Sequence, residues 1–167
     1  MILIIKNFFS IFLLFVIFCD NSYASSYKKA EKEYLNGNYK NVIIQFKSLL
    51  AQGNSAAETL TGIMYLKGEG YKANPEIASI WFYKAAKKGN NNAQLVLGSQ
   101  YLYGLGVKKN FKKAYFWLFL ASKSKEVKVS EKAKEFINIA KKSLSDKDQN
   151  IVKIKLKEWK GYSDNYN

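Results

Sequence analysis

The sequence predicts an all-α fold, a solenoid of stacked helix–turn–helix hairpins, from three observations. Residues 56–124 repeat with a period of 36 positions, apolar residues recur at helical spacing, and glycine pairs separate the helical stretches. A shift of 36 positions gives twelve identities over residues 57–89, and such a period indicates a repeat architecture. The identical pairs are Ala57/Ala93, Gly62/Gly98, Tyr65/Tyr101, Leu66/Leu102, Gly68/Gly104, Gly70/Gly106, Lys72/Lys108, Asn74/Asn110, Ala78/Ala114, Trp81/Trp117, Ala85/Ala121 and Lys87/Lys123.

Each repeat begins with an amphipathic helix, expected over 55–67 in the first copy. Gly62 lies in the middle of this helix, where a glycine costs about 1 kcal/mol relative to alanine. Because Gly98 repeats it, we expect a partner helix to approach both glycines too closely for a Cβ atom. The apolar face follows the i, i+3, i+4, i+7, i+8 spacing of a helix and consists of Ala57, Leu60, Thr61, Met64 and Tyr65.

A glycine-containing turn and a second helix complete the repeat. Gly68 and Gly70 are expected to end the first helix and to supply the positive φ of a tight turn. Pro75 favours the first turn of the second helix, which ends near Gly89. One hairpin cannot bury its apolar face alone, so the hairpins must stack. The apolar face of the second helix carries two small residues on either side of a large one, namely Ala78, Trp81 and Ala85.

These residues resemble the Sel-one-like repeat (SLR) family, which is related to the tetratricopeptide repeats. The family pattern is roughly A-x-x-x-L-G-x-x-Y-x-x-G-x-G-V, followed by K-A, W and A-A-x-x-G. Departures include Thr61 for Leu, Tyr71 for Val, Ile77 for Lys, and Asn74 and Asn110 for Asp. The resemblance implies a right-handed α-solenoid. Its structural repeat residues are Ala57, Gly62, Tyr65, Gly68, Gly70, Ala78, Trp81 and Ala85, then Ala93, Gly98, Tyr101, Gly104, Gly106, Ala114, Trp117 and Ala121.

By analogy with tetratricopeptide proteins, the resemblance also implies a concave binding groove on the first helices of the repeats. The two copies differ at most groove positions while their packing residues agree, as a face selected for a partner would show. Drift on a solvated face gives the same pattern. A groove of Ile, Leu and Tyr beside lysine suits a peptide with apolar and acidic groups. The predicted groove comprises Thr59, Ile63, Leu66, Lys67, Leu95, Ser99, Leu102 and Tyr103.

Residues 1–24 have the features of a secretory signal peptide. A lysine precedes an apolar run over 8–18, and Ser22 and Ala24 are small residues at −3 and −1 of a cleavage site after Ala24. An uncleaved anchor is the alternative, although the run is short for a bilayer. The bulky phenylalanine before Cys19 disfavours lipidation of that cysteine. Cleavage would remove the only cysteine and leave an exported chain, periplasmic or secreted, without a disulfide.

The segments on either side of the repeats, which occupy 55–90 and 91–125, are expected to cap the array. Residues 25–54 predict a degenerate tetratricopeptide-like hairpin with a turn at Gly37. Residues 126–160 predict two capping helices, the second begun by Ser145 with an acid at its third position, and 161–167 predict a flexible tail. The apolar faces expected are Tyr27, Ala30, Tyr34, Leu35, Tyr39, Val42, Ile43, Phe46, Leu49 and Leu50, then Ala133, Phe136, Ile137, Ala140, Ile151, Ile154, Leu156 and Trp159.

The residue types argue against an enzyme and predict no metal or cofactor site. The chain has no histidine, the commonest general base, and its cysteine lies in the predicted signal peptide. Ser122 and Lys125 match a Ser–Lys hydrolase spacing without the companion motifs. The Gly-x-Gly pairs follow helices and lack the further residues of phosphate-binding loops. The repeated aromatic residues, Trp81, Trp117, Tyr65 and Tyr101, are expected in the core.

The chain has 27 lysines against 13 acidic residues, a net charge of +14, and residues 108–167 hold sixteen of the lysines. This charge would attract an acidic protein or an anionic envelope surface, or it only solvates a lysine-biased chain. Nucleic acid is disfavoured because an exported protein without arginine lacks the usual readout residues. We therefore predict a non-catalytic scaffold or adaptor for a protein or peptide partner. The alternatives are a secreted effector that contacts host proteins, and a cell-envelope hydrolase or its regulator.

Overall fold

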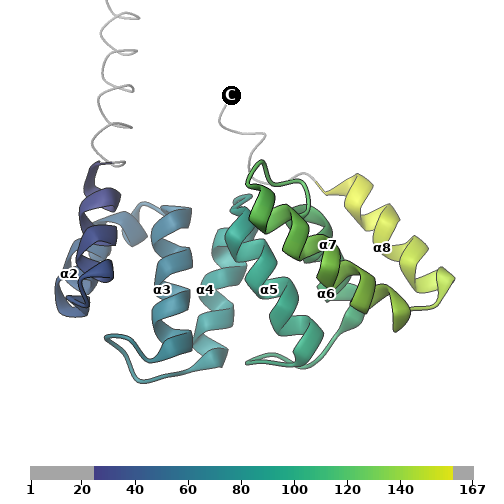
Figure 1. Cartoon of the computed structure of the whole chain (residues 1–167), viewed down its shortest axis with the longest axis horizontal. Helices are drawn as coiled ribbons and strands as arrows, with labels where there is room; N and C mark the ends of the chain where they lie inside the picture. Colours follow the sequence, from purple (N-terminus) through teal and green to yellow (C-terminus); the bar gives the residue numbers. More distant parts are fainter. Residues whose placement is uncertain (1–24, 160–167) are drawn as a thin grey trace, which may run out of the picture. The chain divides into compact units, whose positions relative to one another are not determined.

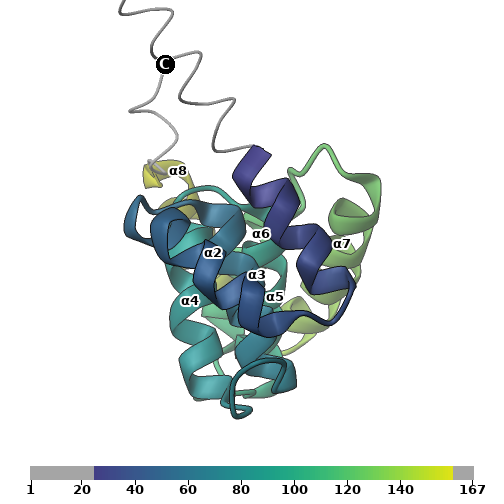
Figure 2. The same ribbon diagram turned by 90° about the vertical axis from the view of Figure 1, so that its left-hand side faces the viewer.

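The computed structural model describes residues 25–159, and over that range it contains helices and no strand (Figures 1 and 2). The predicted all-α class is therefore confirmed. The chain divides into two compact units, residues 1–52 and 53–167. The predicted signal peptide over 1–24 and the predicted tail over 161–167 lie outside the described residues.

The described part of the first unit is a helical hairpin. Residues 25–35 are helical, Gly37 makes the turn with φ 76°, and α2 spans Tyr39–Ala51. Asn41 and Asn38 donate their side-chain amides to Glu33 Oε2 at 3.1 and 3.0 Å. These hydrogen bonds hold the pKa of the Glu33 carboxyl below its usual range. The turn is therefore fixed by polar contacts of its own.

The buried residues of this hairpin follow the predicted faces with one exception. Leu35 is 76 % exposed, because it is the last helical residue before the turn and the chain leaves the helix there. Its assignment to the apolar face was wrong. The fully buried side chains are Ala30, Val42, Phe46 and Leu49.

Four helices of the second unit form two hairpins that stack in chain order (Figure 1). α3 (Ser55–Lys67) pairs with α4 (Pro75–Lys87), and α5 (Asn91–Tyr103) pairs with α6 (Phe111–Ala121). α4 also packs against α5 and so joins the hairpins. The hydrophobic core crosses from one hairpin to the next and includes Ala78, Phe82, Ala85, Ala86, Ala93, Leu97 and Trp117.

Asparagine side chains begin all four of these helices. Each accepts a hydrogen bond from the backbone N–H three residues further on, which satisfies a donor that the helix leaves unpaired. Asn74 and Asn110 also donate their own backbone N–H to the carbonyls of Tyr65 and Tyr101, both at 2.8 Å. At these two positions the asparagine side chain therefore caps the helix that follows, and the asparagine backbone N–H connects the turn to the helix that precedes it.

Three of the repeated glycines, Gly62, Gly98 and Gly106, lie where neighbouring groups leave no room for a side chain. A Cβ atom on Gly62 would lie 2.7 Å from Cε1 of Phe82, and one on Gly98 would lie 2.6 Å from Cγ of Leu118. The predicted close approach of the second helix is confirmed at both positions. A Cβ on Gly106 would overlap the backbone carbonyl of Pro75 in the preceding repeat. The side chain of Gln100 donates to that same carbonyl at 3.5 Å.

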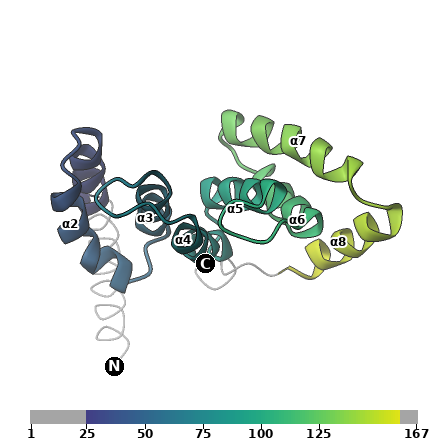
Figure 3. The same cartoon turned by 90° about the horizontal axis from the view of Figure 1, so that it is seen from below.

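Two further helices complete the second unit. α7 (Val127–Lys142) packs against α5 and α6, and α8 (Asp146–Glu158) packs against α6. Figure 3 shows α7 and α8 on two different sides of the α5–α6 hairpin. The Ser145 hydroxyl accepts a hydrogen bond from the backbone N–H of Asp148 at 3.2 Å, so the predicted cap of α8 is confirmed.

The buried face of α8 differs from the prediction. Ile151 and Ile154 are 36 % and 56 % exposed, whereas Val152 is 2 % exposed. Leu156 and Trp159, which were predicted correctly, continue the line of Val152 at i+4 and i+7 and pack against the core. Val152, Leu156 and Trp159 are therefore the residues buried against the core, whereas Ile151 and Ile154 stay at least one-third exposed.

Candidate protein-binding surface

The eight residues of the predicted groove do not form one exposed surface. Thr59 and Leu102 are 7 % and 1 % exposed, so their assignment to a binding face was wrong. The Thr59 hydroxyl donates to the carbonyl of Ser55 at 2.7 Å, and Leu102 belongs to the core together with Ile137 of α7. Both side chains therefore make contacts within the protein and are not available to a partner.

Four other groove residues are half-buried. Ile63 and Leu66 pack against the core between the hairpins, and Leu95 packs beneath α7. The Ser99 hydroxyl donates to the carbonyl of Val96 at 2.7 Å. The remaining two groove residues, Lys67 and Tyr103, are exposed.

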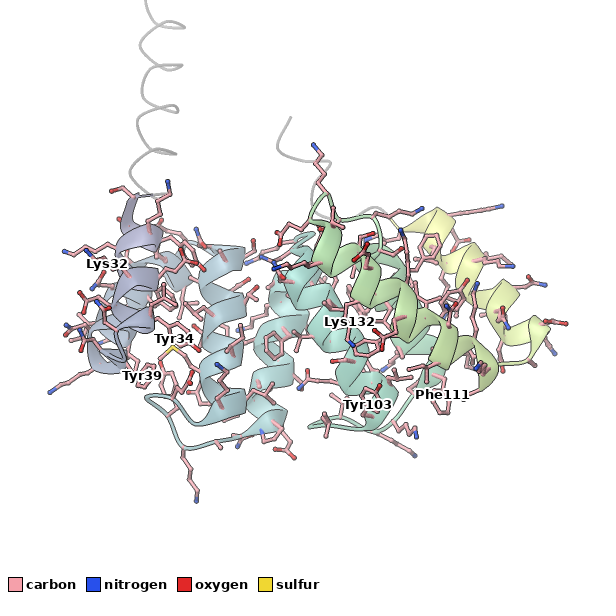
Figure 4. The ribbon with its side chains drawn as sticks, in the orientation of Figure 1. Lys32, Tyr34, Tyr39, Tyr103, Phe111 and Lys132 are labelled. Atoms are coloured by element: carbon pink, nitrogen blue, oxygen red, sulfur yellow. The ribbon has the colours of Figure 1, made fainter. Side chains whose placement is uncertain are left out.

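The exposed residue Tyr103 is joined to α7, which the sequence did not place beside the groove. Its ring meets the ring of Phe136 edge-on with 5.9 Å between centroids. Lys132 Nζ lies 4.7 Å from the centroid of the Phe136 ring. We call Tyr103, Phe136 and Lys132 the α5–α7 face. Figure 4 shows Tyr103 and Lys132 on these two helices.

The α5–α7 face combines an aromatic surface with positive charge. Tyr103 is 50 % exposed, and Phe136 is half-buried. Lys132 pairs with Glu135 at 2.9 Å, but both side chains are at least half-exposed, so this ion pair is weak and exchangeable. A cation held over an aromatic ring and an exposed tyrosine can contact an apolar and acidic partner segment.

The repeated tryptophans differ in their burial. Trp117 is 5 % exposed, and its ring meets the rings of Phe116 and Trp159 edge-on with 5.2 and 5.5 Å between centroids. The prediction that Trp117 is a core residue is therefore confirmed. Trp81 is only half-buried, with Lys84 Nζ 4.3 Å from its ring centroid. Tyr65 and Tyr101 are half-buried and pack against the core.

A buried ion pair lies in the first repeat and was not foreseen. Lys88 Nζ lies 2.7 Å from Glu58 Oε1 and donates to the carbonyl of Gly53 at 2.8 Å. The Glu58 side chain is 4 % exposed, and its other oxygen has no hydrogen-bond partner among residues 25–159. In the second repeat Gln94 stands at the position of Glu58 and donates to the carbonyl of Ala86 at 3.1 Å. The one signal in the sequence was a glutamate on the apolar side of an amphipathic helix.

Ser122 is held by the backbone and is not set up as a nucleophile. Its hydroxyl donates to the carbonyl of Phe119 at 2.7 Å, as is common near a helix end, and Lys125 is exposed. Over residues 25–159, no group of three His, Cys, Asp or Glu side chains could hold a metal ion. In the same range no helix is both long and apolar enough to cross a membrane.

The comparisons with known proteins agree with this architecture. A model of the Sel1 repeat family matches residues 55–90 and 91–125. A protective antigen of uropathogenic Escherichia coli strains that displays an SLR fold has a similar crystal structure. Its TM-score is 0.75 at 26 % identity, covering 86 % of this chain and 31 % of that one. A Sel1 repeat protein from Oxalobacter formigenes has a TM-score of 0.58 at 26 % identity, covering 74 % and 56 % respectively.

The present chain thus spans less than two thirds of the length of either structure. A search of curated protein sequences found no match. Sel1 repeat proteins generally act as scaffolds for protein–protein interactions and are typically non-catalytic. Two matching repeats, their shared glycine and asparagine geometry, and the similar SLR structures lead to one conclusion. The chain contains two Sel1 repeats, at residues 55–90 and 91–125, and shares the fold of SLR proteins.

Proposed function

We propose that the chain is a non-catalytic scaffold that is exported and binds a partner protein through the α5–α7 face. The observation that carries this proposal is the half-exposed ring of Tyr103, which packs against Phe136 beside Lys132. Tyrosine combines a large contact area with little conformational entropy and is enriched among the residues that dominate interface energetics. The two Sel1 repeats that the chain contains support a protein as the partner.

The chemistry of the face defines the kind of partner segment. An apolar or aromatic side chain would cover Tyr103 and the exposed part of Phe136. An acidic group would compete with Glu135 for Lys132, since the existing ion pair is exposed and weak. We therefore propose a segment that carries both apolar and acidic residues, the kind of segment that would also suit the predicted groove. The face retains Tyr103 from that groove and adds α7.

Site-specific photo-crosslinking tests this proposal. A photoreactive phenylalanine analogue at position 103 of the chain 25–167 should capture one partner protein from cell-envelope or host extracts. Lys132→Glu should weaken the capture by about tenfold or more, since it places like charge against an acidic segment. Lys153→Glu on α8 is the matched control, because it makes the same charge change on an exposed lysine outside the face.

The salt dependence and the control decide the outcome. A specific partner should remain crosslinked at high salt, because apolar contact with Tyr103 is not screened. If Lys132→Glu and Lys153→Glu reduced the crosslinking yield equally, or if high salt alone abolished crosslinking, binding would depend on the net charge of the protein. In that case the α5–α7 face is not the docking site.

Export is tested separately from binding. The predicted cleavage after Ala24 requires that the protein recovered from a bacterial envelope or medium begins at Ser25. Intact-mass measurement of the fractionated protein gives the answer directly. A protein that keeps its first 24 residues and stays in the cytoplasm would contradict the export proposal and leave the binding proposal standing.

A further inference from the structure

A second candidate site lies between α6 and α8, away from the α5–α7 face. It is a cavity of about 320 Å³, within the range of small-ligand sites. Its floor is formed by Phe116 of α6 and by Val152 and Ile151 of α8. Phe116 also contacts Trp117 and Trp159 edge-on, so the floor is backed by packed aromatic rings. We call this cavity the α6–α8 pocket.

Three lysines surround the apolar floor. Lys112 and Lys113 come from the first turn of α6, beside the capping Asn110, and Lys155 comes from α8. Lys112 forms an ion pair with Asp148 at 3.0 Å. No ion pair involves Lys113 or Lys155 among residues 25–159, and Lys113 Nζ lies 5.1 Å from the ring centroid of Tyr101. Two of the three positive charges at the pocket are therefore not neutralised in the described part of the chain.

The first repeat shows that the two lysines of α6 are not required for the helix to form. Glu76, Ile77 and Ile80 stand 36 residues before Lys112, Lys113 and Phe116, and α4 forms with the same asparagine cap. The first turn of α4 thus contains an acid, whereas that of α6 contains two lysines and no acid. Within this chain the lysine pair is therefore found in α6 and not in α4, although Lys113 is also the lysine of the family pattern from which Ile77 departs.

We propose that the α6–α8 pocket binds an apolar carboxylate, a compact apolar group that carries one carboxylate. The apolar group would occupy the floor, and Lys113 and Lys155 would bind the carboxylate. A bare inorganic anion would leave the apolar floor in water, and a neutral apolar molecule would leave both lysines without a counter-charge. A free small acid and the carboxyl end of a polypeptide share the proposed chemistry.

Calorimetric titration of the chain 25–167 with 3-phenylpropionate tests the pocket. The neutral isostere 3-phenylpropionamide is the ligand control, because it keeps the ring and removes the charge. We expect the acid to bind at least about tenfold more tightly than the amide, as charge-assisted hydrogen bonds would require. A peptide that ends in phenylalanine, with a free or an amidated carboxyl end, extends the same comparison to polypeptides.

Two double variants separate the pocket from general electrostatics. Lys113→Met with Lys155→Met removes both proposed partners and keeps the length of the side chains, and we expect the affinity to fall about tenfold. Lys153→Met with Lys157→Met removes the same charge from exposed positions of α8 that do not line the pocket. Circular dichroism and urea midpoints of both variants verify that they are folded.

Each result decides the proposal. Preference for the acid, lost only in the Lys113/Lys155 variant, supports it. Tighter binding of the free-ended peptide then identifies a polypeptide end, and tighter binding of 3-phenylpropionate identifies a small acid. Equal binding of acid and amide, no heat of binding for any ligand, or equal loss in both lysine variants would overturn it.

Discussion

At the residue scale, Gly62 and Gly98 illustrate how one atom sets the distance between helices. Alanine normally stabilises the middle of a helix by about 1 kcal/mol relative to glycine. At these positions the added methyl group would meet Phe82 or Leu118 at less than 3 Å. Packing therefore outweighs helix propensity, and that is why both copies of the repeat keep the residue with the poorer propensity.

We expect Gly98→Ala to destabilise the protein by about 1–3 kcal/mol, the usual cost of overpacking a core. Urea unfolding followed by circular dichroism measures it. Combining Gly98→Ala with Leu118→Ala makes room for the methyl group, so the cost of the alanine should be smaller in that background. A stabilising Gly98→Ala would mean that the helices separate easily and that the close approach is unimportant.

Glu58 and Lys88 form an ion pair in which the charge of Glu58 is almost fully buried. The carboxylate is 4 % exposed and has a single partner in the described part of the chain, whereas the lysine is 33 % exposed and can still reach water. Removing one member of such a pair leaves an uncompensated buried charge, which costs more than the pair contributes when intact. Gln94 at the equivalent position of the second repeat shows that a neutral side chain fits the fold.

Lys88→Met should therefore destabilise the protein, by about 2 kcal/mol after allowing for the exposure of the lysine. Adding Glu58→Gln should recover part of the loss, because it removes the stranded charge and reproduces the residue of the second repeat. Urea midpoints of the two single variants and the double variant give the coupling. A double variant that is less stable than Lys88→Met alone would contradict this interpretation.

At the element scale, α8 is held by a narrow apolar line and by contacts at its first turn. Val152 and the half-buried Leu156 and Trp159 face the α5–α6 hairpin. At the first turn, Lys112 of α6 donates to Asp148 at 3.0 Å. The hydrogen bond from Lys112 and its positive charge lower the pKa of the Asp148 carboxyl. The attachment of α8 should therefore respond to acid.

The sign of this response follows from linkage. A carboxyl whose pKa is lower in the folded state stabilises the fold above its unfolded pKa, about 4, and loses that contribution as the pH falls through the folded pKa. Asp148→Asn lacks this contribution throughout. We expect the wild type to be more stable than Asp148→Asn at pH 7, and the difference to shrink steadily below about pH 4.

Urea midpoints between pH 7 and pH 2.5 measure the difference. Asp146→Asn is the matched control, because it removes an equal charge from the same first turn without the partner Lys112. If both variants showed the same dependence on pH, the helix dipole alone would explain it. The contact between Asp148 and Lys112 would then contribute nothing measurable.

At the scale of the whole molecule, repetition is what made most of the second unit predictable. The twin glycines, the Gly68 and Gly104 turns and the Pro75 helix start all appear twice or lie inside a repeated pattern, and the structure has them where expected. A residue that recurs after 36 positions is seldom accidental, so its presence in both repeats supports a structural role for it. The capping serine of α8 could be predicted because its signal is local.

The binding surface could not be predicted in the same way. Leu102 matches Leu66, yet Leu66 is half-buried while Leu102 joins the core with Ile137 and Ala140 of α7. α7 has no copy elsewhere in the chain, so no periodicity indicated that it would cover one end of α5. The buried face of α8 was predicted wrongly for a related reason. Two faces of this helix carry apolar residues, and only its packing against α6 determines which of them is buried.

The division into two units leads to a prediction of its own. Residues 53–159 contain a continuous set of core clusters, with Leu97, Leu118 and Ile137 among their members. We expect a fragment 53–167 to fold alone with a single cooperative urea transition, as small domains usually do. A fragment with helical circular dichroism but a broad, non-cooperative transition would mean that the first unit is needed for a fixed core.

The contact between Gly106 and Pro75 bears on how such an array lengthens during evolution. One side of the contact is a backbone carbonyl, which every residue possesses, and the other side must be a glycine. A duplicated segment can therefore be added behind any existing repeat, provided that the newcomer brings its own glycine. The position one period beyond Gly106 is Lys142, within α7. A residue with a Cβ atom could not make the same close contact with a carbonyl, so the contact seen at Gly106 is not repeated there.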